Sequence, residues 1–305
     1  MDGRLESSQR GAYQLIRTEV RTLIQDLLQQ PDLRLAVVGH VEWMSFMQVD
    51  QLPSAGRVAH AASSIEHPAG GGAVCAVRMA QLSGASVQFF TALGRDEIGE
   101  RSKRELEAFG LDVHVVWKDQ PTRRGVSMVD KSGDRAITVI GERLQPQASD
   151  PLPWSTLRDC DGVFVSAADP EALKACRAAR VMTATPRVRL GNLRESAIQL
   201  DALIGSGLDP DEGLPEELGF PRPLLQIATE GAAGGLLIPG GRYEPSKAPN
   251  PSVDSYGCGD SFAAGVTVGL AAGWEVRDAV RLGAKAGAAC TAWLGPYALE
   301  QKIRS

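Results

Sequence analysis

The stretch VDSYGCGDSFAAG, residues 253–265, places a glycine-rich turn and an aspartate at the start of an apolar segment. Gly257 and Gly259 permit backbone conformations that other residues rarely adopt, and they let a ligand approach closely. A buried helix beginning near Asp260 would present unpaired amides and partial positive charge to an anion. An aspartate at that place could accept a proton from a hydroxyl group. These residue types and this spacing suit phosphoryl transfer to an alcohol, with the backbone turn as the anion hole.

A structural role for Asp260 is the alternative. Aspartate is among the best N-cap residues, and glycine turns precede many helices. The two interpretations are compatible, because an aspartate at a helix start can be positioned by the helix and still act as a base. The turn alone does not decide between them.

The elements around this turn predict an α/β domain. Short apolar runs such as LRLAVVGH and SVQFFTAL are typical of buried strands, and AGGGAVCAVRMAQLSG predicts a helix that follows a glycine turn. After Pro153, strand and helix patterns alternate, which indicates βαβ units and a mainly parallel sheet. We therefore expect a three-layer core with helices on both faces. Two β-rich segments, near residues 41–66 and 113–141, are expected to form a small sheet beside it.

Composition excludes several function classes. The 305-residue chain is 43% hydrophobic and carries a net charge of −5, so no overall basic field favours nucleic acid or an anionic membrane. The five cysteines form no CxxC pair, which favours reduced thiols and a cytoplasmic location. The apolar run after Asp260 is shorter than the roughly 20 residues of a membrane-spanning helix. The first residues lack the apolar region of a signal peptide.

Residues 12–30 have the apolar spacing of an amphipathic helix, which Pro31 ends. Such a helix packs on its own domain or pairs two chains, and the sequence leaves both interpretations open. We expect residues 1–32 to form a helical extension of the domain. The partners expected for the chain are a small molecule and a second copy, as a homodimer.

The 253–265 stretch resembles the C-terminal signature of the ribokinase-like, PfkB-type carbohydrate kinases, D-T-x-G-A-G-D. Asp254, Gly257, Gly259 and Asp260 match that pattern. Four further segments resemble family segments in order and spacing, so that the resemblance covers most of residues 33–298. They are AGGGAVCAVRMAQLSG, TALGRDEIGERSKRELEAFGLDV, PTRRGVSMVDKSGDRAITVIG and IATEGAAGGLLI.

The resemblance implies a ribokinase-like domain over residues 33–305, with lid segments near 41–66 and 113–141. It implies an ATP-dependent kinase that uses Mg²⁺ and phosphorylates a sugar or nucleoside-like molecule. Asp260 would be the base, and the amides of Gly257, Cys258 and Gly259 would form the anion hole. The remaining implied contacts are Thr229, Gly231, Gly234 and Asp254 for the nucleotide, and Glu42, Gly70, Gly71 and Gly72 for the acceptor.

The sequence departs from the family pattern in three places, one of them a motif of two residues. Val74 stands where the family has an asparagine that contacts the sugar. After the first strand, where the family usually has an aspartate that holds substrate hydroxyls, this sequence has Glu42 nearby. The family N-x-x-E motif becomes Ser206 and Asp209, since the pair in GNLRES follows Pro186 too closely. Asp209 could still meet Mg²⁺ through water, because Mg²⁺ retains several waters.

Two other classes of function remain open from the sequence. The loss of polar residues at the acceptor end would suit a small-molecule sensor that keeps the fold without catalysis, although a sensor need not retain Asp260. An oligomeric scaffold built by residues 12–30 has less support. No GxxxxGK[ST] motif is present, so the sequence does not support a Walker-type nucleotide site.

Overall fold

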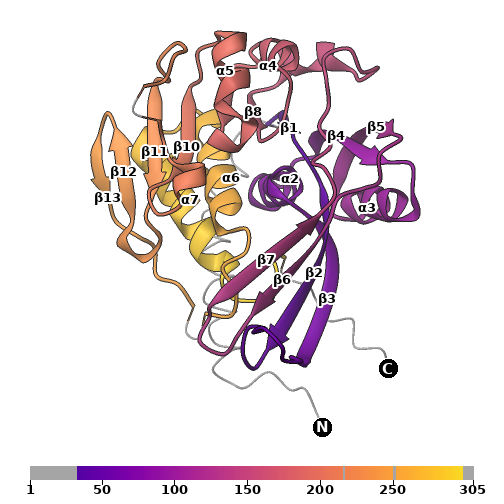
Figure 1. Cartoon of the computed structure of the whole chain (residues 1–305). Helices are drawn as coiled ribbons and strands as arrows, with labels where there is room; N and C mark the ends of the chain where they lie inside the picture. Colours follow the sequence, from indigo (N-terminus) through magenta and orange to yellow (C-terminus); the bar gives the residue numbers. More distant parts are fainter. Residues whose placement is uncertain (1–32, 216, 250–251, 298–305) are drawn as a thin grey trace.

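The computed structural model describes residues 33–215, 217–249 and 252–297. The predicted helix at residues 12–30 lies outside the described residues. The described chain builds a large sheet of nine strands and a small sheet of four. Figure 1 shows the small sheet projecting from the body that surrounds the large one.

The large sheet has the strand order β13-β12-β11-β10-β9-β8-β1-β4-β5. All pairs from β5 to β11 are parallel, and β12 and β13 add an antiparallel edge. The prediction of a mainly parallel central sheet is therefore confirmed. Its strands are β1 (Leu35–Val38), β4 (Val87–Gly94), β5 (Leu111–Lys118), β8 (Gly162–Val165), β9 (Val181–Ala184), β10 (Ala202–Ser206), β11 (Leu225–Thr229), β12 (Gly235–Ile238) and β13 (Gly241–Tyr243).

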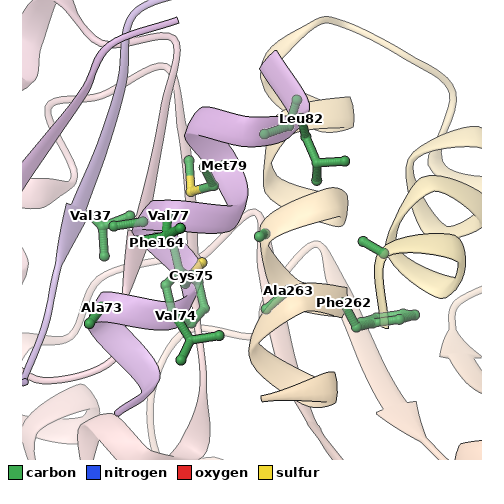
Figure 2. Packing of buried hydrophobic residues seen from close by; sticks show 14 of the residues in the cluster. Val37, Ala73, Val74, Cys75, Val77, Met79, Leu82, Phe164, Phe262 and Ala263 are labelled. Atoms are coloured by element: carbon green, nitrogen blue, oxygen red, sulfur yellow. The ribbon is translucent and has the colours of Figure 1, made fainter. Parts of the chain in front are cut away.

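Helices cover both faces of this sheet, as the sequence predicts. Alternate residues of β1 enter two separate cores: Leu35 and Val37 join the core that includes α2 and α6, and Ala36 and Val38 join the core that includes α4 and α5. Figure 2 shows α2 and α6 side by side with their apolar side chains between them. The helices are α2 (Gly71–Ser83), α3 (Glu97–Ala108), α4 (Pro170–Cys176), α5 (Leu190–Ser196), α6 (Cys258–Ala271) and α7 (Val276–Cys290). Short 3₁₀ helices span Trp154–Asp159, Pro186–Val188, Pro210–Glu212 and Gly231–Ala233.

The small sheet has the order β3-β2-β6-β7. Its strands are β2 (Glu42–Val49), β3 (Ala61–Ala69), β6 (Arg124–Val129) and β7 (Arg135–Ile140). The expectation for residues 113–141 needs a correction, because Leu111–Lys118 forms β5 at the edge of the large sheet. This segment follows α3 and pairs in parallel with β4 along eight residues, as a βαβ crossover requires. Within residues 113–141, the strands of the small sheet therefore begin only at Arg124.

No helix within the described residues is long and apolar enough to cross a membrane. All five cysteines are free: Cys75, Cys160, Cys176, Cys258 and Cys290. Cys258 lies in the first turn of α6 and Cys290 ends α7, so two of the thiols lie near the glycine turn.

Candidate active site

Helix α6 begins at Cys258, two residues before the predicted start. Gly257 is its N-cap residue, with φ 79°, and no side chain caps the helix. Asp260 is therefore the third residue of the helix, and the N-cap interpretation of this aspartate is wrong. Asp260 is only 5% exposed, and its Oδ1 accepts a hydrogen bond from Nη2 of Arg187. Among the described residues, nothing donates a hydrogen bond to Oδ2.

The turn requires glycine at position 257 for two reasons. Its φ lies in the left-handed region, and a Cβ there would lie 2.9 Å from Cβ of Pro296 and 3.0 Å from Cγ1 of Val74. Val74, which replaces the family asparagine, is fully buried on α2 and packs against this turn. Gly259 differs, because a Cβ at that position would meet no atom within 4 Å.

Asp254 is bonded to the backbone of the turn and lines neither of the two cavities described below. Its Oδ1 accepts a hydrogen bond from the amide of Tyr256 and its Oδ2 from the amide of Gly295, both at 2.9 Å. The side chain is 3% exposed, and the nearest cation, Nη1 of Arg135, is 3.9 Å away. Asp254 therefore positions the turn, and its expected contact with a nucleotide remains a prediction.

Two cavities meet at this turn. The smaller, of about 330 Å³, is lined by Asp260 and the carboxylates of Asp209 and Glu212. The larger, of about 760 Å³, is lined by the predicted nucleotide residues Thr229, Gly231 and Gly234. Both volumes fall in the usual range of ligand pockets. The residues common to the two cavities are Thr229, Ser255, Cys258 and Gly259, so the cavities adjoin at the start of α6, and of the two only the small one is lined by Asp260.

Arg187 and Glu212 are site residues that sequence reasoning missed. The guanidinium of Arg187 bonds Asp260, and its Nε lies 3.3 Å from Oε1 of Glu212. Burial acts to lower the pKa of Arg187, but the negative charges of Asp260 and Glu212 outweigh burial and raise it. Arg187 lies in the short connection after β9, at the carboxyl end of the parallel strands where α/β folds place their sites. Its place directly after a predicted strand was the feature of the sequence that could have identified Arg187 as a site residue.

The smaller cavity contains candidate groups for a hydrated metal ion. Within the described residues, no cluster of three or more His, Cys, Asp or Glu side chains could hold a metal directly. Asp209 and Glu212 share the cavity with Ser206, whose Oγ accepts a hydrogen bond from the amide of Asp209 at 3.0 Å. Mg²⁺ binds through one or two carboxylates and phosphate oxygens while it keeps several waters, so these residues fit that ion.

The predicted acceptor residues pack beside Asp260 and do not line either of the two cavities. A Cβ on Gly71 would be 3.0 Å from Oδ1 of Asp260, and a Cβ on Gly70 would be 3.2 Å from Cγ of Glu42. A Cβ on Gly72 would lie 2.7 Å from the carbonyl oxygen of His40, so that turn is closely packed. Glu42 is buried, with Nε of Arg123 3.2 Å from its Oε1. The structure thus brings Glu42 and the second glycine turn, residues 70–72, together with Asp260.

His40, which the sequence analysis did not single out, is buried between these residues. Its Nε2 accepts a hydrogen bond from the amide of Gly71 at 3.4 Å, and its Nδ1 has no partner within the described residues. Burial lowers the pKa of His40 well below its ordinary value, and the positive charge of Arg143 adds to this effect. Burial raises the pKa of Glu42, against the opposing effect of Arg123. A neutral imidazole therefore lies beside a buried carboxyl group.

The lowered pKa of His40 predicts a loss of stability in mild acid. The folded protein keeps His40 neutral, whereas the unfolded chain takes up a proton below about pH 6.5, so the stability that His40 contributes is complete above pH 6.5 and falls below it. One proton accounts for about 2 kcal/mol of unfolding free energy between pH 7 and pH 5. Denaturant unfolding of His40→Gln should show a shallower decline over this range than the unmodified protein. The exposed His60→Gln is the control, and equal slopes for His40→Gln and the unmodified protein would contradict the assignment.

Comparisons with known proteins bear on the family and the fold of this chain. The model of the family described as "pfkB family carbohydrate kinase" matches residues 32–202 and 223–302. The chain is 26% identical to the ATP-dependent ribose-1-phosphate kinase of Halopiger xanaduensis, over 76% of this chain and 83% of that protein. It is 24% identical to the ribokinase of Arabidopsis thaliana, over 84% and 75%. Of the solved structures, the ribokinase of Thermotoga maritima superimposes with a TM-score of 0.69 at 24% identity, over 87% and 94% of the two chains.

Proposed function

The chain belongs to the pfkB family of carbohydrate kinases, and we propose that it transfers the γ-phosphoryl group of ATP to a hydroxyl of a sugar or nucleoside-like molecule. The observation that carries this proposal is the place of Asp260. It lines the small cavity, next to the residues at which that cavity joins the large one. The proposed base is thereby adjacent both to the proposed nucleotide site and to residues 70–72, the turn proposed to contact the acceptor.

In the proposed reaction, Asp260 takes the proton of the acceptor hydroxyl through Oδ2 while Arg187 holds Oδ1. The acceptor oxygen forms a bond to the γ-phosphorus, the bond from that phosphorus to the β–γ bridging oxygen breaks, and ADP leaves with that oxygen. The phosphoryl oxygens face the start of α6. The amides of Gly257 and Gly259 donate to no acceptor among the described residues, and that of Cys258 donates to the carbonyl of Ser255 at 3.3 Å. These amides would stabilise the transferring group.

We assign the large cavity to the nucleotide, bordered by Thr229, Gly231 and Gly234. The similarity to an ATP-dependent kinase supports ATP as the donor. Asp209 and Glu212 would hold Mg²⁺ through water, and the ion when bound would neutralise charge on the phosphates. The names of the relatives support a sugar as acceptor. A homodimer and a cytoplasmic location remain predictions.

ADP formation tests the proposed function. Purified protein with ATP and Mg²⁺ is offered a panel of pentoses, hexoses, their monophosphates and nucleosides, and acceptor-dependent ADP release is followed. The proposal predicts turnover with at least one member of the panel. Calorimetry with the same compounds distinguishes the alternative, because a sensor would bind a ligand without consuming ATP. Binding with no ADP release across the panel would overturn the kinase assignment.

A further inference from the structure

One tyrosine connects the two glycine turns of the site. Tyr256 lies directly before the phosphoryl turn, residues 257–259, at the position that the D-T-x-G-A-G-D pattern leaves unspecified. Its hydroxyl oxygen accepts a hydrogen bond from the amide of Gly70 at 3.2 Å, across 186 positions of sequence. Gly70 begins the acceptor turn, residues 70–72. Tyr256 therefore joins the turn proposed to hold the transferring phosphoryl group to the turn proposed to contact the acceptor.

This hydrogen bond is buried. Tyr256 is 8% exposed, and within the described residues the amide of Gly70 has no other acceptor. Burial raises the pKa of Tyr256, and the negative charges of Glu42 and Asp260 add to this effect, so the hydroxyl stays neutral. Loss of the hydroxyl would leave a buried amide unpaired, which is more costly than the loss of a hydrogen bond exposed to water.

The backbone of Tyr256 is fixed independently of its side chain. Its amide donates a hydrogen bond to Oδ1 of Asp254 at 2.9 Å, and its carbonyl accepts one from Sγ of Cys290 at 3.2 Å. Cys290 is the last residue of α7, so both partners belong to the body of the domain. The hydroxyl thus extends from an anchored backbone to the acceptor turn.

The small sheet packs on the ring of Tyr256. Phe46 of β2 meets it edge to face, with ring centroids 4.8 Å apart and an interplanar angle of 77°. From β7, Cζ of Arg135 lies 5.7 Å from the centroid of the ring. Phe46 is fully buried, which limits the positions that the ring can take. The direction of the hydroxyl therefore depends on the small sheet.

The acceptor turn is in close contact with the proposed base. A Cβ on Gly71 would lie 3.0 Å from Oδ1 of Asp260, and a Cβ on Gly70 would lie 3.2 Å from Cγ of Glu42. A shift of Gly70 would therefore change the distance from the acceptor turn to both carboxyl groups. Rates of group transfer depend steeply on such distances, since a displacement of about 1 Å can cost 10²-fold.

We propose that Tyr256 is a positioning residue, whose hydroxyl holds the acceptor turn in place relative to Asp260 and the phosphoryl turn while the small sheet holds its ring. This inference rests on the proposed function and concerns the same site. Tyr256 lines neither cavity, so the proposal separates the two substrates. Use of the acceptor depends on the hydroxyl of Tyr256, and binding of the nucleotide does not.

Tyr256→Phe tests this separation, because it keeps the ring and removes the acceptor of the Gly70 amide. The kcat/KM for the acceptor should fall roughly 10-fold, while the Kd of ATP measured by calorimetry stays unchanged. Tyr297→Phe is the matched control. Tyr297 is 2% exposed and its hydroxyl donates to the carbonyl of Pro68 at 2.8 Å, so this variant loses a buried hydrogen bond and should keep its kcat/KM.

Two results would overturn the proposal. An unchanged kcat/KM for the acceptor in Tyr256→Phe would remove the positioning role. A loss of ATP affinity as large as the loss in kcat/KM would show general damage to the turn, as a merely structural tyrosine predicts.

Phe46→Leu tests the part of the small sheet. Without the edge-to-face contact the hydroxyl is held less firmly, so kcat/KM for the acceptor should fall a few-fold. Combined with Tyr256→Phe, it should add little, because the hydrogen bond through which it acts is already absent. Fully multiplicative losses would contradict the dependence of the hydroxyl on the small sheet.

Hydrogen exchange separates this inference from the proposed kinase function, because it needs no turnover. A peptide that includes Gly70 should exchange its amides faster in Tyr256→Phe than in Tyr297→Phe or the unmodified protein. Faster exchange in a protein that phosphorylates no member of the acceptor panel would retain the link between the turns and reject the kinase. Unchanged exchange and unchanged kcat/KM in an active kinase would reject the positioning role alone.

Discussion

Asp260→Asn is expected to lower kcat by about 10²- to 10⁴-fold, the usual contribution of a positioned general base. Asparagine keeps the size of the side chain and can still accept the hydrogen bond from Arg187, but it cannot take the proton of the acceptor hydroxyl. Binding of ATP should change little, because the nucleotide cavity is lined by Thr229, Gly231 and Gly234 and not by Asp260. The measurement is steady-state kinetics with calorimetry of nucleotide binding.

Two controls keep this result interpretable. Asp112→Asn, at an exposed position of β5, should leave kcat unchanged. Thermal unfolding should show that Asp260→Asn still folds, since Arg187 retains Glu212 as a partner at 3.3 Å. A kcat of the Asp260→Asn protein equal to that of the unmodified enzyme would remove Asp260 from the role of base.

Gly257→Ala is expected to have the second largest effect, on both stability and rate. The position has φ 79°, and the added methyl group would lie 2.9 Å from Pro296 and 3.0 Å from Val74. The left-handed backbone and the contact together should cost about 1–3 kcal/mol of unfolding free energy. Movement of the turn would misplace the amides of Gly257 and Gly259, and the loss of one anion-hole donor lowers kcat by about 10²- to 10³-fold.

Gly259→Ala is the matched comparison for stability in the same turn. A methyl group there meets nothing within 4 Å, and alanine favours a helix over glycine by up to about 1 kcal/mol. Thermal and denaturant unfolding should therefore find Gly257→Ala less stable and Gly259→Ala at least as stable as the unmodified protein. Equal stabilities of the two variants would contradict the close packing of the turn around Gly257.

Local sequence patterns predicted most of the fold. The apolar runs and glycine turns placed β1, α2, β4, α3 and α6 correctly, because their burial follows from short-range periodicity. The same patterns assigned residues 113–118, which belong to β5, to the lid. A strand in a small sheet and an edge strand in a large sheet have the same alternation, and only the pairing of β5 with β4 separates them.

Side chains that act through long-range contacts were the ones that sequence reasoning missed. Arg187 and Asp260 are 73 positions apart, and no motif links them. Asp254 matched a family pattern, but its two backbone partners give it a positioning role that the pattern alone does not reveal.

Phosphorus NMR of the complete reaction tests the central claim most directly. The unmodified protein is incubated with ATP, Mg²⁺ and the best acceptor of the panel, and the phosphorus resonances are followed with time. Transfer to a hydroxyl predicts a new phosphomonoester that grows in equal amount with ADP, and Asp260→Asn should form this ester far more slowly at the same protein concentration. ADP that appears with inorganic phosphate and without a new ester would contradict the account.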